Sequence, residues 1–386
     1  MKGSRNYGID IFRIWAMLSI ITLHILGHGG VMNNLINYSF AYYLVWALYL
    51  CCQCGVNCYG LISGYVMINN KLTYKKIALL WAEVAFYTIS LMLIFKYFTN
   101  NPVTKKDIYN SFFPLTTYQY WYFTNYFLLF MIAPFINKFI NSVDRVTNKK
   151  LVITLVLVLS VLPILARYDL FSESYGYSTL WLSCLYIIGA YVKKYNLGKR
   201  KIGLYLLSYV AFTSLTLLSV YIINVLYLKV NNFNSFGFYL YGYNSPTMLA
   251  SSVSLLIFSS KIKTKLFNKK IFIILSKATF GVYLFHDNYF VRQFIITDRF
   301  LPLAHLSNPY LIIFKIVFSA IIILSIGTVI DVIRLFMFKG IATSLKLIKT
   351  RLISLKQKNI NIGELNGRKT SAQYNLQQVR REFESK

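Results

Sequence analysis

The sequence predicts an all-α, polytopic membrane bundle of about ten transmembrane helices. The 386 residues are 56% hydrophobic and only 14% charged, so polar residues are too few to cover the surface of a soluble protein. Apolar runs of roughly 17–25 residues recur along the chain, and a helix of that length crosses a bilayer core. These runs are continuous rather than alternating, which argues against a transmembrane β-barrel.

The predicted spans follow one another with short connections. A window of about 19 residues places them at 11–30, 39–66, 77–97, 119–136, 151–167, 179–193, 202–228, 245–260, 271–290 and 310–337. Residues 1–337 are therefore predicted to form a transmembrane domain, and residues 338–386 a basic cytoplasmic tail. The first span is no cleavable secretion signal, because Asp10 and Arg13 interrupt it and no small-residue cleavage site follows.

The loops between the predicted spans differ in their lysine and arginine content. One alternate set is dense in these residues: 71–76, 137–150, 193–201 and 261–270. The other set is sparse in them and rich in Asn, Tyr and Ser: 98–118, 168–178, 229–244 and 291–309. Because basic loops remain in the cytoplasm, we expect both termini there, in agreement with an even number of spans.

The strong positive charge has an explanation in this topology. The net charge of +29 comes from 41 basic and 12 acidic residues, and in a soluble protein it would favour nucleic-acid binding. Here most basic residues lie in the short loops, and no helix-turn-helix, zinc-finger or RRM-like motif is found. We expect membrane lipids as partners, with the tail near anionic headgroups, and no nucleic acid.

Four of the five cysteines crowd into residues 51–58. Three of them, Cys51, Cys54 and Cys58, would share a helix face, so a thiolate metal site is conceivable. No histidine or carboxylate lies nearby to complete a ligand shell, and cysteine also serves as a small apolar residue in membrane helices. We expect no metal.

Three ionisable residues in or beside the first span, Asp10, Arg13 and His24, are notable because such a group costs about 2.5–3.5 kcal/mol inside a membrane. Arg13 and His24 are eleven positions apart, so they share a helix face at about 16 Å separation. Asp10 lies one turn before Arg13 and can pair with it. Such a stripe could bind an anionic donor at one end and transfer protons at the other. Arg13 as a topology signal, and His24 as a hydrogen-bonded interhelical contact, are the structural alternatives.

A second concentration of polar residues lies at 276–287. Tyr283 and His286 are neighbours on one helix face, and this span runs in the same direction as the first. His286 should therefore reach the same depth as His24, which favours a cavity shared by the two. In the third span, Glu83 is a candidate counter-ion for Arg13 or for the lysines that precede it.

Residues 10–24, Asp10-Ile-Phe-Arg13 through His24, resemble the opening signature of the acyltransferase-3 family of membrane-bound acyltransferases. Three later stretches are similar to family segments in the same order: Gly60–Tyr65, Trp121–Pro134 and Ser276–His286. Together these matches cover most of residues 5–290. The resemblance implies about ten helices with both termini in the cytoplasm, which agrees with the loop charges.

The resemblance also implies an activity. Relatives transfer a small acyl group, usually acetyl, from cytoplasmic acyl-CoA to a hydroxyl of a cell-surface polysaccharide or lipid-linked sugar, in the plasma membrane of bacteria. His24 and His286 are then the catalytic candidates, and Arg13 contacts the donor. Ser276 and Tyr283 line the site.

The residues expected to bind the acyl donor differ from the family pattern in one respect. Many relatives carry an Arg-x-x-Arg motif near the start of the third helix, where this sequence has Lys75 and Lys76. Lysine neutralises phosphate but lacks the bidentate fork of arginine. The expected donor- or substrate-binding residues are Asp10, Arg13, Lys75, Lys76, Glu83, Ser276 and Tyr283.

These residue types suit acyl transfer from a thioester. A histidine can deprotonate the acceptor hydroxyl near neutral pH, and Tyr283, Ser276 or backbone N–H groups can stabilise the oxyanion. Cations at the cytoplasmic mouth can bind the CoA phosphates. Acyl-CoA is expected as a substrate, with no bound cofactor.

Three other functions remain open from the sequence. A polysaccharide exporter or flippase without acyl-transfer activity would also use a ten-helix bundle with aromatic outer loops. A polysaccharide polymerase usually needs a larger outer loop than any found here, and a structural or sensory protein could use the same intramembrane charges for packing. The sequence also leaves the oligomeric state open, a homo-oligomer included.

Overall fold

The structure, a computed structural model, describes residues 5–70, 73–166, 168–171, 174–229, 240–262 and 269–384. Throughout these ranges the regular elements are helices without any strand, so the predicted all-α class is confirmed. Residues Met1–Ile330 form one compact unit and Asp331–Lys386 a second. The border between domain and tail at residue 337 stays a prediction.

Within the described ranges, seven helical segments are long and apolar enough to cross a membrane. They are α1 (Tyr7–Leu26), α2 with α3 (Phe40–Gln53, Gly55–Met67), α4 (Tyr74–Phe98), α6 (Trp121–Ser142), α7 with α8 (Arg145–Val156, Leu162–Ala166), α10 (Ile202–Lys229) and the first part of α14 (Pro309–Glu384). A chain with several such segments is a multi-pass membrane protein, as its composition predicts.

The other three predicted spans form shorter or more polar helices. Helices α9 (Thr179–Lys194) and α11 (Pro246–Lys261) have 16 residues each, so they extend about 24 Å where a bilayer core needs about 30 Å. Helix α12 (Lys269–His286) carries three lysines in its 18 residues. The predicted count of about ten spans is therefore not confirmed, and the orientation of the termini stays a prediction.

Short elements connect the longer helices. They are α5 (Lys105–Phe112), α13 (Tyr289–Val291), two π-helical turns (Leu157–Val161, Arg292–Ile296) and three 3₁₀ turns (Met32–Asn34, Ser174–Gly176, Leu301–His305). The π turn that follows α13 matters for function, because π turns alter where side chains point and this one begins with Arg292.

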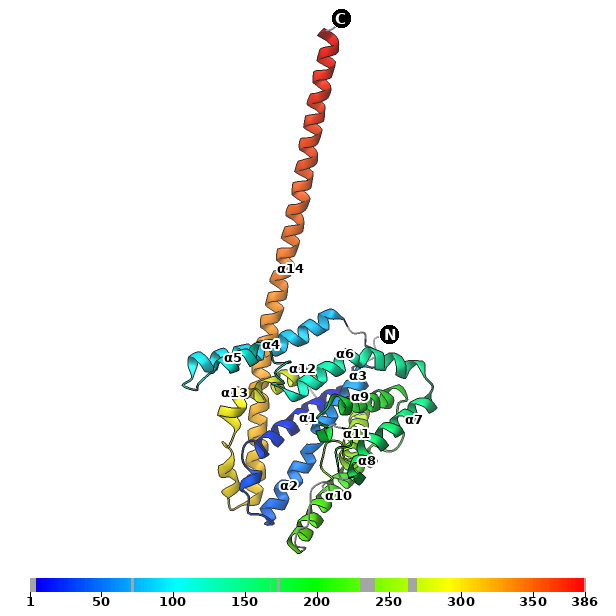
Figure 1. The fold of residues 1–386 in the computed structure, drawn as a ribbon, viewed down its shortest axis with the longest axis vertical. Helices are drawn as coiled ribbons and strands as arrows, with labels where there is room; N and C mark the ends of the chain where they lie inside the picture. The colour runs from blue at the N-terminus through cyan, green and yellow to red at the C-terminus, as the bar shows by residue number, and fades with distance from the viewer. Residues whose placement is uncertain are drawn as a thin grey trace. The chain divides into compact units, whose positions relative to one another are not determined.

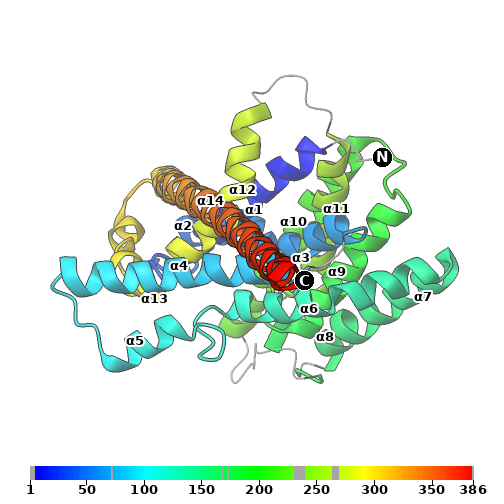
Figure 2. The same cartoon turned by 90° about the horizontal axis from the view of Figure 1, so that it is seen from above.

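Helix α1 lies at the centre of the first unit. It packs against α2, α3, α11 and α12, and Figures 1 and 2 show it enclosed by other helices. Its start is fixed by Asn6, whose side chain accepts a hydrogen bond from the Ile9 amide and donates one to the Ser260 carbonyl of α11. Because α1 is surrounded by protein, it can carry Asp10, Arg13 and His24 without exposing them to lipid.

Helices α3 and α9 cross at backbone contact. A Cβ atom on Gly64 would overlap the Tyr186 carbonyl, and one on Gly189 would overlap the Leu61 carbonyl. Small residues permit such close crossings in membrane bundles. The crossing holds α3 tightly, which matters because α3 supplies wall residues to both cavities described below.

The second unit consists of the later part of α14. Asp331 and Arg334, one turn apart, form an ion pair in which Nε lies 2.7 Å from Oδ1. Beyond them the chain is free of proline, and from residue 345 onward it is polar and basic. Nothing therefore breaks the helix by ring clash or by a missing N–H group, and α14 ends at Glu384.

Candidate active site

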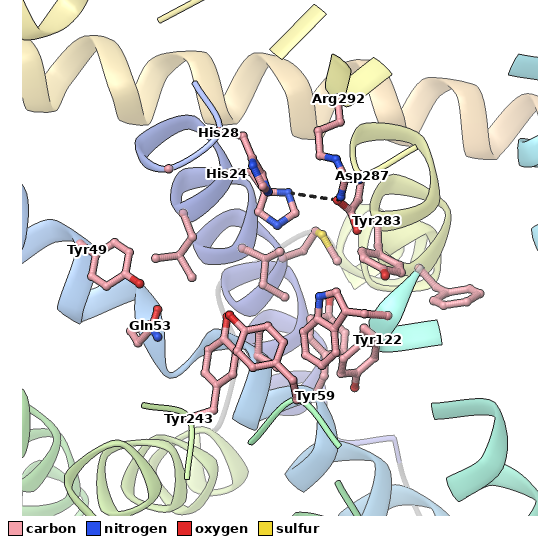
Figure 3. Close-up of a pocket in the computed structure, with 18 residues that line it drawn as sticks. His24, His28, Tyr49, Gln53, Tyr59, Tyr122, Tyr243, Tyr283, Asp287 and Arg292 are labelled. Carbon is pink, nitrogen blue, oxygen red and sulfur yellow. Dashed lines mark hydrogen bonds and ion pairs between the residues drawn. The ribbon is translucent and has the colours of Figure 1, made fainter. Parts of the chain in front are cut away.

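A cavity of about 370 Å³ lies in the first unit beside α1. Four polar residues gather at one end of it: His24, His28, Asp287 and Arg292 (Figure 3). Aromatic side chains form much of the remaining wall: Tyr49, Tyr59, Trp121, Tyr122, Tyr177, Tyr243, Phe280 and Tyr283. We call this the histidine cavity. Its concave, largely apolar wall with a few converging polar groups is typical of a small-molecule site.

The polar end is organised around Asp287. His24 Nδ1 lies 3.8 Å from Asp287 Oδ1, and Arg292 Nη1 donates to the same oxygen at 3.0 Å. Figure 3 shows His24 directing this nitrogen at the carboxylate and its other ring nitrogen into the cavity. The separation of 3.8 Å exceeds a hydrogen bond, but catalytic hydrogen bonds often tighten only when substrate is bound. The Asp287 side chain is 3% exposed, so the charge of Arg292 compensates its burial.

The turn after α12 fixes the position of Asp287. Tyr120 donates a hydrogen bond to the Leu284 carbonyl at 2.8 Å, and Asn288 donates to the Tyr120 hydroxyl at 2.9 Å. Asn288 also caps α13 by accepting from the Phe290 amide. These contacts end α12 directly before Asp287 and turn its carboxylate toward α1.

Three imidazoles meet at this end of the cavity. The His24 ring centroid lies 5.0 Å from that of His286 and 5.1 Å from that of His28. His286 is completely buried behind His24, and its Nδ1 lies 2.7 Å from the Val282 carbonyl, which favours a proton on Nδ1. His28 lies beyond the end of α1, where burial lowers its pKa and the nearby Arg292 lowers it further. The rings of His24 and His286 thus lie side by side, but of these two residues only His24 lines the cavity, so the cavity that both were expected to share is lined by one of them.

Tyr283 lines the cavity beside the histidines. Its ring centroid lies 6.3 Å from that of His286. Its hydroxyl is buried and has no hydrogen-bond partner within the described part of the chain. The same is true of the Tyr122 hydroxyl on α6. A buried hydroxyl without a partner is costly, about 1–3 kcal/mol, so both groups are available to a ligand.

A second cavity, of about 290 Å³, lies at the other end of α1. Its lining residues are Arg5, Asn6, Ile9, Asp10, Arg13, Tyr65, Val66 and Lys193. Lys193 Nζ lies 4.8 Å from the centre of the Tyr65 ring, a cation–π contact that holds the ammonium group at the wall. We call this the arginine cavity. With three basic side chains and one acid, it suits an anionic ligand.

Asp10 ties this end of the bundle together. Arg5 donates to both of its oxygens, at 2.7 and 2.8 Å, and Ser276 on α12 donates to it at 2.8 Å. The hydrogen bonds with Asp10 also raise the pKa of Arg5 above its usual value. The predicted pairing of Asp10 with Arg13 is thus not found in the described residues, because Arg5 takes that place. Ser276 lies away from the histidine cavity wall.

Three of the expected donor-binding residues lie elsewhere. Lys75 is exposed at the start of α4, and Lys76 lines a separate cavity of about 200 Å³. Glu83 is half-buried in α4 and lines neither the histidine nor the arginine cavity. The reason is that α4 packs against α5, α12 and α13 rather than along the first turns of α1.

Sequence reasoning missed several residues of these two cavities, among them His28, Asp287, Arg292 and Lys193. A signal existed for His28, which lies four residues after His24 and so on the same side of the chain. Asp287 directly follows His286 in the stretch already singled out. Arg292 and Lys193 resemble ordinary loop and helix-end charges, and only the fold shows that they line cavities.

A comparison with protein families decides the class of this site. The family model described as an acyltransferase domain matches residues 6–330. The chain belongs to the acyltransferase-3 family. Together with the membrane-spanning helices, this membership makes it a membrane-bound acyltransferase. No curated protein and no solved structure matches this acyltransferase.

Proposed function

We propose that this acyltransferase moves a small acyl group, most simply acetyl, from acyl-CoA on the cytoplasmic side to a hydroxyl of a cell-surface polysaccharide or lipid-linked sugar. One observation carries the proposal: a single helix, α1, presents Arg13 to one cavity and His24 to another. The basic loops predicted to be cytoplasmic include Lys193, a wall residue of the arginine cavity. The donor therefore binds at the arginine cavity, and its thioester reacts at the histidine cavity.

The reaction needs one base and one oxyanion donor. His24 Nε2 takes the proton of the acceptor hydroxyl as its oxygen attacks the thioester carbonyl carbon. The Tyr283 hydroxyl donates to the carbonyl oxygen as it becomes negative. The C–S bond then breaks, and His24 returns the proton to the sulfur, so that the products are an ester and free CoA thiol.

Asp287 orients the base. A proton on His24 Nδ1 faces the carboxylate, which leaves Nε2 unprotonated toward the cavity. The carboxylate also stabilises the imidazolium that forms when Nε2 accepts its proton. The Arg292 guanidinium, which donates to Asp287 at 3.0 Å, favours the charged form of this buried carboxylate.

The aromatic wall supports a sugar as acceptor. Trp121 and Tyr177 have ring centroids 4.5 Å apart, and Tyr177 and Tyr243 have theirs 4.8 Å apart. Such rings offer flat apolar faces together with hydroxyl and indole N–H groups, and sugars present both apolar faces and hydroxyls. An exporter could use the same wall. The two functions differ in whether an acyl group is transferred.

Deleting the gene tests the proposed function. The surface glycans of the deletion strain should lose ester-linked acyl groups, measured by NMR and by mass spectrometry before and after mild alkali. Restoring the wild-type gene should restore the esters. Glycans that disappear from the surface, while those that remain keep all their esters, would support the exporter instead.

Replacing Tyr283 with phenylalanine removes one oxyanion donor and little volume. We expect kcat for acyl transfer to fall about tenfold, which is the upper range for one hydrogen bond, with KM for the donor unchanged. Tyr227→Phe, an exposed tyrosine of α10, is the matched control. Equal kcat values for wild type and Tyr283→Phe would remove Tyr283 from the mechanism.

Replacing Arg13 with alanine removes a cation from the arginine cavity. We expect KM for acetyl-CoA to rise about tenfold or more, because a charged hydrogen bond contributes about 1.5–3 kcal/mol, while kcat changes little. Arg200→Ala, an exposed arginine in a neighbouring basic loop, should leave KM unchanged. A drop in kcat alone would place Arg13 in the chemistry rather than in donor binding.

A further inference from the structure

The histidine and arginine cavities approach each other at Tyr59, on α3. The Tyr59 ring lines the histidine cavity, and its hydroxyl donates to the backbone carbonyl of Arg13 at 3.0 Å. The side chain of Arg13 lines the arginine cavity. Met17, one turn further along α1, already belongs to the histidine cavity. Tyr59 therefore stands at the partition between the two.

Tyr122 stands beside Tyr59 on the same wall. The two ring centroids are 6.4 Å apart with the rings nearly perpendicular, and Tyr122 stacks on Tyr126 at 5.9 Å. These contacts hold the Tyr122 ring from two sides. Its hydroxyl is buried, yet no described residue forms a hydrogen bond with it. A fixed, buried and unpartnered hydroxyl on a cavity wall points to a ligand group that completes it.

The chemistry of a CoA thioester fits this partition. One end of the molecule is a bulky nucleotide with charged phosphates, which suits the arginine cavity. The other end is a thin, uncharged arm that contains two amide groups and terminates in the thioester sulfur. Along α1, Arg13 and His24 are separated by about 16 Å, so only an extended arm can connect phosphates at one cavity with a thioester at the other.

We propose that Tyr59 and Tyr122 form a neck that binds the amide-bearing arm of the donor between the two cavities. The Tyr122 hydroxyl donates to one amide carbonyl of the arm. The Tyr59 hydroxyl turns from the Arg13 carbonyl to the arm as the arm enters, and so keeps a hydrogen bond in both positions. The inference rests on acyl-CoA as the donor in the proposed function.

If Tyr59 and Tyr122 form this neck, they recognise the arm of the donor and not its nucleotide. Three probes separate the parts: acetyl-CoA, S-acetylpantetheine (the arm without the nucleotide) and adenosine 3′,5′-bisphosphate (the nucleotide end without the arm). The dissociation constant of each would be measured by calorimetry on the purified full-length protein in detergent. The variants are Tyr59→Phe and Tyr122→Phe. Tyr186→Phe is the matched control, because its buried hydroxyl donates to Asn137 away from both cavities.

Tyr122→Phe should weaken acetyl-CoA and S-acetylpantetheine by the same factor, about three- to tenfold for one hydrogen bond. Tyr59→Phe should weaken the same two probes. Adenosine 3′,5′-bisphosphate should bind all variants equally, and Tyr186→Phe should bind every probe like wild type. Each variant's melting temperature would verify that it is folded.

Three results would overturn the inference. If wild type binds acetyl-CoA, and both neck variants bind all three probes like wild type, then Tyr59 and Tyr122 do not bind the arm. Acyl-CoA would still stand as the proposed donor. An equal loss for the bisphosphate would likewise refute the neck, because the contact would then be with the nucleotide. If wild type binds no acetyl-CoA, the proposal that acyl-CoA is the donor is wrong, and the proposed role of Tyr59 and Tyr122 fails with it.

Discussion

Replacing His24 with alanine is expected to lower acyl transfer about 10³-fold, in the middle of the range of about 10²–10⁴ that a general base contributes. No neighbouring imidazole can replace it. His286 is fully buried behind His24, with Nδ1 against the Val282 carbonyl. His28 lies beside His24 but has no comparable approach to Asp287 among the described contacts. The measurement is release of CoA thiol with acceptor present, together with ester analysis of the glycan.

The control for this prediction is His305→Ala, because His305 is an exposed histidine in a short 3₁₀ turn. It should transfer acyl groups like wild type. Donor affinity of His24→Ala, measured with acetyl-CoA, should also remain near the wild-type value, since the arginine cavity is unchanged. A His24→Ala protein with full transfer activity would exclude the mechanism proposed here.

Replacing Asp287 with asparagine should lower kcat about 10²-fold. The amide has nearly the shape of the carboxylate, but it cannot stabilise an imidazolium and can hold His24 in the wrong tautomer. Arg292 would lose its partner at the same time. We expect KM for acetyl-CoA to change little, because Asp287 lines only the histidine cavity of the two. Steady-state kinetics with the identified glycan would measure both constants.

Arg292→Gln provides an independent check of this pair. It leaves a buried carboxylate without its cation, which is costly, so kcat should fall and melting temperature should fall with it. Asp298→Asn, an exposed aspartate in the same connection, should alter neither. If Asp287→Asn keeps the wild-type kcat, His24 does not depend on Asp287 for its orientation.

The fold class could be predicted from the sequence because composition and run length depend only on local residues. The number of spans could not, since an apolar run does not reveal whether the helix faces lipid or protein. Helix α9 illustrates this: it packs on α3 and α6, and its glycine meets the α3 backbone. A helix enclosed in this way can be shorter than the bilayer core.

The candidate site was predictable to the extent that its residues are unusual within apolar runs. His24, Arg13 and Tyr283 line cavities, as their positions in otherwise apolar helices suggest. Asp10 and Ser276 were singled out for the same reason, yet their side chains serve a contact between helices: Asp10 accepts hydrogen bonds from Ser276 and from Arg5. Asp287 depends on a turn held by Tyr120, a residue 164 positions from the Leu284 carbonyl that it contacts, and no local pattern encodes such a contact.

Acyl transfer through the bundle, from one face of the membrane to the other, is the central claim, and reconstituted vesicles test it most directly. Acetyl-CoA labelled in the acetyl group would be supplied on one face, and surface glycan from the deletion strain on the other. Wild-type protein should place ester-linked label on the glycan, whereas His24→Ala should place almost none. Glycan that crosses the vesicle membrane without acquiring label would contradict the account and identify an exporter.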